Sequence, residues 1–389
     1  MGPEDTDEIV FTGQRIRWKG NTLVVDQDKA IEELSEIQFD ESLKNEVACN
    51  PTLRTEYRSL LGSLNWLQST QFQIAFKFSR CVSAAASPTI GDVRAFNKVV
   101  RSVRSQPVRL HFWPMDRLRG LLARIVGYPD ASYRNNSDGS SQRAQVIFLA
   151  EPRTTSKHTR RSLVDYESQK IKRTTLSTTV SELYSFMKCF GTCQFVRGLW
   201  KDISGEAAPI HLRTDASNLV TRASTTHLPE QKEIIHMIRM LRKESCSGEI
   251  DDLAHVRTED CLSDSLTKQN IKADTLTKAV ETGISNNIHT HPSCRDMLKH
   301  TCINGLPCMY RKQPLGNVSW AHHCTRLQEQ PKLKILIDVM LCVNATEFVF
   351  EKIAFARYYC IMASLSAFAR FLPSFVFAEP LEGSPGIKD

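Results

Sequence analysis

Apolar and polar residues alternate between residues 9 and 25, on both sides of the turn sequence Lys19-Gly20-Asn21. Alternation with a period of two is typical of a half-buried β-strand, and a short glycine-containing turn between two such runs is typical of a hairpin. We therefore expect a β-hairpin at the start of the chain, followed by a helix over residues 28–34.

Apolar residues then recur at helical spacing over residues 57–84, and again over residues 90–103 after the turn sequence Ser87-Pro88-Thr89. This spacing predicts amphipathic helices, each with one apolar face turned toward a core. Since these helices carry no cluster of residues suited to chemistry, we expect a supporting, mostly helical domain.

From residue 118 the pattern changes to short apolar runs at residues 122–128, 145–150 and 210–213, with a long helical stretch at residues 180–202. Short strands interrupted by a long helix are typical of an α/β domain. This part of the chain therefore differs in fold class from the helical part before it.

The segment over residues 153–169 has few apolar residues and several basic ones, namely Arg153, Lys157, Arg160 and Arg161. A charge-rich segment of this kind predicts a solvated loop. The functional alternative is contact with a phosphate backbone.

The composition changes once more after Gly283, where a polar segment precedes an apolar C-terminus. We therefore divide the chain into a connection region at residues 1–117, an α/β domain at residues 118–283, and an unassigned tail at residues 284–389.

The tail holds two features that deserve a functional interpretation. Cysteines and histidines gather between His289 and Cys324, but their spacings match no zinc finger or knuckle. The apolar stretch from Tyr358 to Ala378 is interrupted by Arg370 and a proline, so we expect no membrane span. A membrane-attached protein that uses this stretch is the alternative.

The overall composition changes this picture little. The chain has 389 residues, 41% hydrophobic and 24% charged, which is typical of a globular protein of two or three domains. A net charge of +7 permits a nucleic-acid partner without requiring one. Twelve cysteines without a CxxC pair, and no N-terminal signal sequence, predict a reduced, intracellular protein, in the cytoplasm or the nucleus.

Four acidic residues stand where strands end or helices begin. Asp130 and Asp215 each end an apolar run, Glu182 falls in the first turn of the long helix, and Asp264 lies in a short helical stretch after residues 255–258. Carboxylates from two strands and two helix starts can converge on one site.

Such a site suits the hydrolysis of a phosphodiester. The reaction needs an activated water and neutralisation of charge on the leaving oxygen, and two divalent ions about 4 Å apart supply both. Carboxylate oxygens are the natural ligands of Mg²⁺. Taken singly, each acid also has a structural interpretation: Asp130 and Asp215 as turn or cap residues, Glu182 as the partner of Thr179 in a capping box, and Asp264 as an exposed helix residue.

Seven segments together resemble the copia-type retrotransposon Pol polyprotein. Residues 57–67 (YRSLLGSLNWL) are similar to the segment that follows the polymerase in that family, and residues 75–80 and 95–103 to its helical connection. Residues 127–133 (GYPDASY), 176–184 (LSTTVSELY), 214–217 (TDAS) and 255–268 (HVRTEDCLSDSLTK) then resemble, in order, its GYxDADW, LSSTEAEY, DNxSA and YVxTxxQxADxLTK motifs.

The resemblance implies a ribonuclease H (RNase H) domain with a mixed five-stranded sheet and flanking helices, and a magnesium-dependent enzyme that cleaves the RNA strand of an RNA/DNA hybrid. It implies two Mg²⁺ ions, with Mn²⁺ as a substitute. Asp130 would bridge both ions, Glu182 and Asp215 would hold one, and Asp264 would complete the other.

Two departures from the family pattern matter. The chain has no Tyr-x-Asp-Asp polymerase motif, so we expect no polymerase activity and a polymerase domain supplied, if at all, by another chain. A second ADxLTK-like segment at residues 272–278 offers Asp274 in place of Asp264. We prefer Asp264, which follows the strand-like segment at the family's spacing. His227 and His236 receive no role.

Two functions from different classes follow. The first is a retrotransposon-derived ribonuclease that acts on RNA/DNA hybrids with divalent metal. The alternative is an inactive retroelement fragment that binds nucleic acid or a protein. Four carboxylates in the family's order favour the enzyme, whereas the missing polymerase and the unfamiliar tail favour the fragment.

Overall fold

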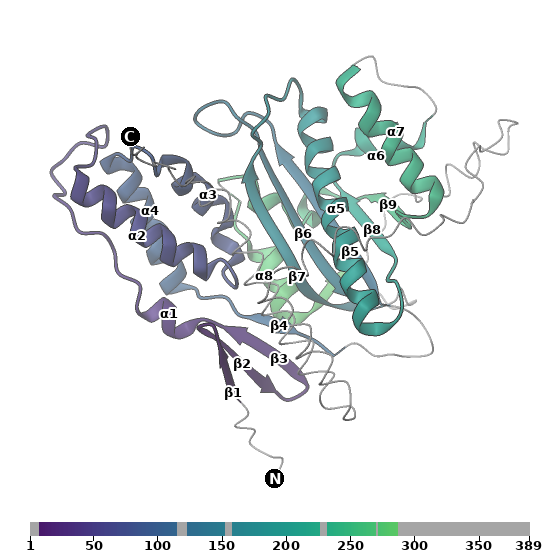
Figure 1. The fold of residues 1–389 in the computed structure, drawn as a ribbon, viewed down its shortest axis with the longest axis horizontal. Coiled ribbons are helices and arrows are strands. Elements are labelled where there is room, and N and C mark those ends of the chain that lie inside the picture. Colours follow the sequence, from purple (N-terminus) through teal and green to yellow (C-terminus); the bar gives the residue numbers. More distant parts are fainter. Residues whose placement is uncertain (1–7, 115–122, 152–157, 226–231, 270, 287–389) are drawn as a thin grey trace, which may run out of the picture.

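The computed structural model describes residues 8–114, 123–151, 158–225, 232–269 and 271–286 (Figure 1). The Cys/His-rich segment and the apolar stretch of the tail lie outside these residues, as does His227. Within the described part of the chain, no helix is long and apolar enough to cross a membrane.

A four-stranded antiparallel sheet opens the fold. Its strands, in spatial order, are β1 (Glu8–Phe11), β2 (Gln14–Lys19), β3 (Thr22–Asp26) and β4 (Leu110–Phe112). The predicted hairpin is β2–β3. Lys19 pairs with Thr22 across a two-residue turn whose first residue, Gly20, has φ +59, a conformation that glycine adopts without strain.

Four helices and a short 3-10 turn follow, and they bury a common apolar core. They are α1 (Asp28–Glu32), α2 (Pro51–Leu67), η1 (Phe72–Ile74), α3 (Ala75–Ala84) and α4 (Ile90–Ser105). Helix α2 begins where the Asn50 side chain accepts a hydrogen bond from the Leu53 amide, and α4 begins with a capping box between Thr89 and Asp92.

The helical stretch predicted over residues 57–84 is interrupted between α2 and α3. The buried Gln71 side chain exchanges hydrogen bonds with Val108, accepting from its amide at 2.9 Å and donating to its carbonyl at 2.8 Å. These bonds bind the interruption to the strand region that follows α4. Tertiary hydrogen bonds therefore outweigh the local helical pattern here.

A mixed sheet forms the second half of the fold. Its strands, in spatial order, are β10 (Ile284–Asn286), β7 (His158–Lys170), β6 (Gln142–Ala150), β5 (Arg124–Ser132), β8 (Ile210–Thr214) and β9 (Asp252–His255). The pairs β10–β7, β7–β6 and β6–β5 are antiparallel, and β5–β8 and β8–β9 are parallel. Strands β5 to β9 form the expected five-stranded mixed sheet, and β10 adds a short sixth strand at one edge.

Helices cover both faces of this sheet (Figure 1). They are α5 (Thr178–Ser204), α6 (Ser217–Ser224), α7 (Lys232–Ser247) and α8 (Asp274–Thr282), with the short 3-10 turns η3 (Thr258–Asp260) and η4 (Asp264–Leu266). One apolar cluster joins α5, α6 and α7 to the sheet. A second joins the opposite face to α8, to η4 and to the N-terminal sheet. The fold is α/β.

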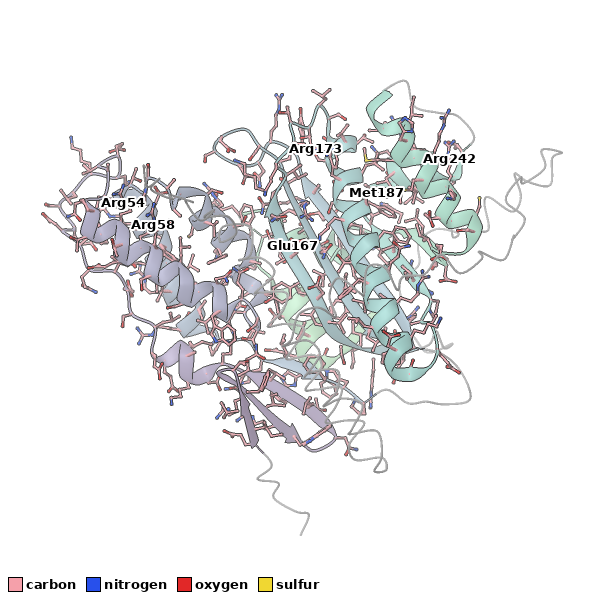
Figure 2. The ribbon with its side chains drawn as sticks, viewed as in Figure 1. Arg54, Arg58, Glu167, Arg173, Met187 and Arg242 are labelled. Atoms are coloured by element: carbon pink, nitrogen blue, oxygen red, sulfur yellow. The ribbon has the colours of Figure 1, made fainter. Side chains whose placement is uncertain are left out.

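The prediction of a solvated loop over residues 153–169 is wrong, because residues 158–170 form β7. Its Arg161 is buried, with its guanidinium over the rings of Tyr128 and Phe148 and one N–H donated to the Tyr128 hydroxyl at 3.0 Å. Arg143 on β6 pairs with Glu167, which is labelled in Figure 2, and the guanidinium nitrogen lies 3.1 Å from the carboxylate oxygen. Cross-strand pairing and cation–π stacking satisfy charges that the sequence pattern attributes to solvent.

Gly127 sets how closely α5 approaches β5. A Cβ at this position would lie 2.8 Å from the sulfur atoms of Cys189 and Cys193 and 2.9 Å from Leu212 Cδ2. Only a residue without a side chain fits this contact unless its neighbours move. The approach brings the start of α5 over the end of β5 that carries Asp130.

Candidate active site

Asp130 lies near the end of β5, in the middle of the sheet, and is 2% exposed. Its carboxylate accepts a hydrogen bond from the Thr267 hydroxyl. Its backbone carbonyl accepts one from the Ser185 hydroxyl of α5 at 2.7 Å, and the same hydroxyl contacts the Ala144 carbonyl of β6 at 2.8 Å. The strand and the helix are thus fixed to each other beside this carboxylate.

Glu182 lies in the second turn of α5 and points to β5. The helix begins at Thr178 with Ser177 as its N-cap, whose hydroxyl accepts from the Val180 amide, so the capping box considered for Glu182 is wrong. The Glu182 carboxylate instead accepts a hydrogen bond from the backbone amide of Ala131, next to Asp130. It is buried.

Asp215 follows β8 directly and is half-buried. Its side chain accepts a hydrogen bond from Thr258, at the start of η3. The N-cap position of the next helix, α6, is Ala216, so Asp215 does not cap that helix. Its carboxylate remains directed to the neighbouring acids.

Asp264 begins η4 and is buried, and the Lys268 ammonium forms an ion pair with its carboxylate. Asp274, the alternative fourth acid, lies in the first turn of α8 and is exposed. The structure therefore brings Asp264, and not Asp274, to the other acids.

Oxygen atoms of Asp130, Asp215 and Asp264 all lie within 4.8 Å of one another. Residues far apart in the sequence thus meet at one end of the sheet, next to Glu182. A set of oxygen donors alone, at this separation, fits a hard divalent cation such as Mg²⁺.

Burial and the closeness of the acids raise the pKa of three carboxyl groups of the cluster. Burial, together with the Asp215 carboxylate, raises the pKa of Asp130 to about 6. Burial and the Asp130 carboxylate raise the pKa of Glu182 well above its ordinary value, and burial raises that of Asp215. Like charges in a low-dielectric site disfavour ionisation unless a cation neutralises them.

Three residues at the site were not assigned a role from the sequence: Thr258, Thr267 and Lys268. Thr267 and Lys268 end the motif that contains Asp264, and Asp264 and Lys268 have the i, i+4 spacing of a helical ion pair. That spacing was a usable signal for Lys268. The hydroxyl contacts depend on the folding of a loop and have no pattern in the sequence.

Three further basic residues, Lys170, Lys172 and Arg173, lie between the end of β7 and the start of α5. Lys172 and Arg173 are exposed, and the Arg173 guanidinium lies 6.0 Å from the ring centroid of Tyr184 (Figure 2). Lys170 forms an ion pair with Asp138. His236 lies exposed on α7.

Curated relatives of the chain are Pol polyproteins. The chain is 23% identical over 248 residues to the retrovirus-related Pol polyprotein from transposon RE2 of Arabidopsis thaliana, and 23% identical over 217 residues to that from transposon RE1 of the same plant. The resemblance to a retrotransposon Pol polyprotein is confirmed. The matches cover 63% and 55% of this chain, but only 16% and 14% of the two relatives.

Other comparisons add less. No family model matches the chain. Among solved structures, LC11-RNase H1 in complex with an RNA/DNA hybrid is similar over 36% of this chain and 88% of its own, with 15% identity and a TM-score of 0.26. The description of a mixed sheet with flanking helices therefore depends on the strand order and pairing given above.

Proposed function

We propose that the chain is a retrotransposon-derived ribonuclease that hydrolyses the RNA strand of an RNA/DNA hybrid with divalent metal. The observation that carries this proposal is the convergence of Asp130, Asp215 and Asp264, with Glu182 beside them, from four separate elements. Structural acids are commonly paired with bases or exposed. This cluster instead brings four acids together, with Lys268 pairing to Asp264, and burial raises the pKa of Asp130, Glu182 and Asp215.

The residues fit the two Mg²⁺ ions that the family resemblance implies, with Mn²⁺ as a substitute. Asp130 would contribute to both ions, Glu182 and Asp215 to one, and Asp264 to the other. When bound, the metal would activate a water and neutralise charge on the leaving oxygen.

The chain's own contribution is to hold these carboxylates in place before substrate binds. Thr267, Thr258 and the Ala131 amide each donate a hydrogen bond to one of the acids, which restricts the rotamer of that acid. Burial of Asp130 excludes bulk water from its side, so the charge of the cluster is weakly screened.

The proposed substrate is a hybrid, because an RNase H groove reads the 2′-hydroxyls of one strand and the deoxyribose backbone of the other. Lys172 and Arg173, exposed just before α5, are proposed as phosphate contacts. A polymerase domain supplied by another chain is the proposed protein partner, since the Pol relatives are several times longer than the matched region.

The test is hydrolysis of end-labelled RNA/DNA, RNA/RNA and DNA/DNA duplexes of one sequence, in one buffer, with Mg²⁺ or with EDTA. We expect cleavage of the RNA strand of the hybrid alone, and only with Mg²⁺. Asp130→Asn should lower the rate by at least about 10³-fold, because it removes a ligand oxygen common to both ions.

Asp274→Asn is the matched control, because it changes the exposed aspartate of the similar second motif and should leave the rate unchanged. Hybrid binding without cleavage by the wild-type chain would favour the inactive fragment. Equal cleavage of the three duplexes would refute hybrid specificity.

A further inference from the structure

We infer that the Lys268 ammonium competes with a divalent cation for the Asp264 carboxylate. Metal should therefore bind weakly on the side of the site that Asp264 forms. This inference rests on the proposed metal site. The carrying observation is the ion pair between the Lys268 ammonium and the buried Asp264 carboxylate.

The backbone that carries Lys268 is held on two sides. The Leu266 carbonyl accepts from the Ser168 hydroxyl of β7 at 2.5 Å, and the Thr267 carbonyl accepts from the Asn135 side chain at 2.9 Å. Thr267 also donates to Asp130. The segment therefore presents the lysine to the acids from a backbone position that is fixed by these bonds.

The charges around Lys268 favour its place at the cluster. The carboxylates of Asp130, Asp215 and Asp264 all attract the ammonium. A cation that binds Asp264 must displace or approach this ammonium, and either costs free energy because like charges repel at short distance. The Lys268 side chain is 36% exposed, so solvent reduces this cost without removing it.

The effect of Lys268 on metal binding should differ from one carboxylate to another. The structure places the lysine in contact with Asp264, whereas Asp130 and Glu182 receive their direct hydrogen bonds from Thr267 and from the Ala131 amide. Metal held by Asp130, Glu182 and Asp215 should therefore bind first, and metal that needs Asp264 should bind at higher concentration.

The experiment measures Mn²⁺ binding to the EDTA-treated full chain without nucleic acid, by isothermal titration calorimetry and by the electron paramagnetic resonance signal of free Mn²⁺. Lys268→Met should bind its weakest Mn²⁺ about tenfold more tightly than wild type, the effect of removing one partly screened charge. Lys268→Arg keeps the charge and should bind as wild type does.

Lys278→Met is the matched control, because Lys278 is the exposed lysine at the corresponding position of the second motif. It should bind Mn²⁺ as wild type does. In an Asp264→Asn background the effect of Lys268→Met should disappear, since the carboxylate for which the two cations compete is gone. If circular dichroism shows that Lys268→Met does not fold, Lys268→Gln replaces it.

Equal or weaker Mn²⁺ binding by the folded Lys268→Met variant would overturn the inference and leave the proposed metal site standing. Absence of Mn²⁺ binding from wild type and all variants would overturn both.

Discussion

At the scale of single residues, Asp130 illustrates how a site can oppose the stability of the fold that holds it. Its pKa is raised from 3.8 to about 6, chiefly by burial. Well below pH 3.8 the carboxyl is protonated in both the folded and the unfolded chain. Between pH 3.8 and about 6 the unfolded chain has released this proton while the folded chain still holds it, so the free energy of unfolding falls over this range and levels off above it.

We therefore predict that Asp130→Asn is more stable than wild type at pH 7 in EDTA, by about 3 kcal/mol at most. Urea unfolding at pH 4, 5, 6 and 7 should show a difference in the free energy of unfolding that is small at pH 4, grows up to about pH 6 and levels off at pH 7. Asp274→Asn, at an exposed position, should show no such trend. A wild-type chain that gains stability relative to Asp130→Asn over this range would contradict the prediction.

Magnesium should reverse this loss of stability. The proposed metal would bind the ionised carboxylates of the folded chain and not those of the unfolded one, so it would stabilise the fold by mass action. We expect 10 mM Mg²⁺, about the level that such assays use, to raise the melting temperature of wild type at pH 7 and to leave that of Asp130→Asn nearly unchanged. Differential scanning calorimetry with Mg²⁺ and with EDTA measures both.

At the scale of elements, the contact between α5 and β5 depends on Gly127. A methyl group here would come within 2.8 Å of two cysteine sulfurs and within 2.9 Å of Leu212 Cδ2. Gly127→Ala should lower the free energy of unfolding by about 1–3 kcal/mol, as overpacked cores do. Chemical denaturation measures this free energy. Adding Cys189→Ala to the Gly127→Ala chain should restore part of the lost stability, because it removes one of the two sulfur atoms that the methyl group would meet.

Gly198→Ala on α5 is the matched control. A Cβ at Gly198 meets nothing within 4 Å, and alanine is a better helix former than glycine by about 1 kcal/mol. This variant should be as stable as wild type or more so. A destabilisation equal to that of Gly127→Ala would show that the effect is not one of packing.

Helix α3 reaches the site through a chain of side-chain contacts. Gln142 on β6 donates to the Ser79 hydroxyl of α3 at 3.1 Å and to the Ser168 hydroxyl of β7 at 2.9 Å, and Ser168 donates to the Leu266 carbonyl. Gln142→Leu should loosen the segment around Asp264. We expect amide hydrogen exchange over residues 264–268 to become several-fold faster, while exchange in α5 stays unchanged.

The elements differ in how much the sequence reveals of them. The α5 helix was predicted because it has apolar positions over many turns, although its N-cap is Ser177 and not the expected Thr179. Strand β7 was missed because its charges, such as those of Arg161 and Glu167, are satisfied only by partners on β5 and β6. The four carboxylates were found through motifs, whereas the bonds from Thr258 and Thr267 follow from a folded loop that no local pattern specifies.

At the scale of the whole molecule, one apolar cluster crosses the predicted boundary at residue 117. It contains Leu23, Leu110 and Phe72 from the N-terminal half and Val126 and Phe148 from the mixed sheet. Side chains in one close-packed cluster lose their contacts together. We expect the two halves to unfold in a single transition, with tryptophan fluorescence and far-ultraviolet circular dichroism giving coincident urea curves.

Leu110→Ala probes the same coupling from one side. This residue is fully buried in β4, and its truncation should cost about 2–5 kcal/mol. If the halves are coupled, hydrogen exchange should accelerate in β5 and β6 as well as in the N-terminal sheet. Acceleration confined to residues 8–112 would instead indicate two independent domains.

Truncation can test where the α/β domain ends. The composition changes after Gly283, but β10 follows this residue and pairs with β7, with Ile284 opposite Arg160. The Gly283 carbonyl also accepts a hydrogen bond from the Arg161 amide at 2.8 Å. A chain that ends at Gly283 loses this edge pairing, whereas one that ends at Asn286 keeps it. We therefore predict that residues 1–286 retain the melting temperature of the full chain and the proposed hybrid cleavage. Residues 1–283 should melt a few degrees lower, as the loss of about 1 kcal/mol would produce. Loss of folding or cleavage in residues 1–286 would mean that the tail contributes to the fold.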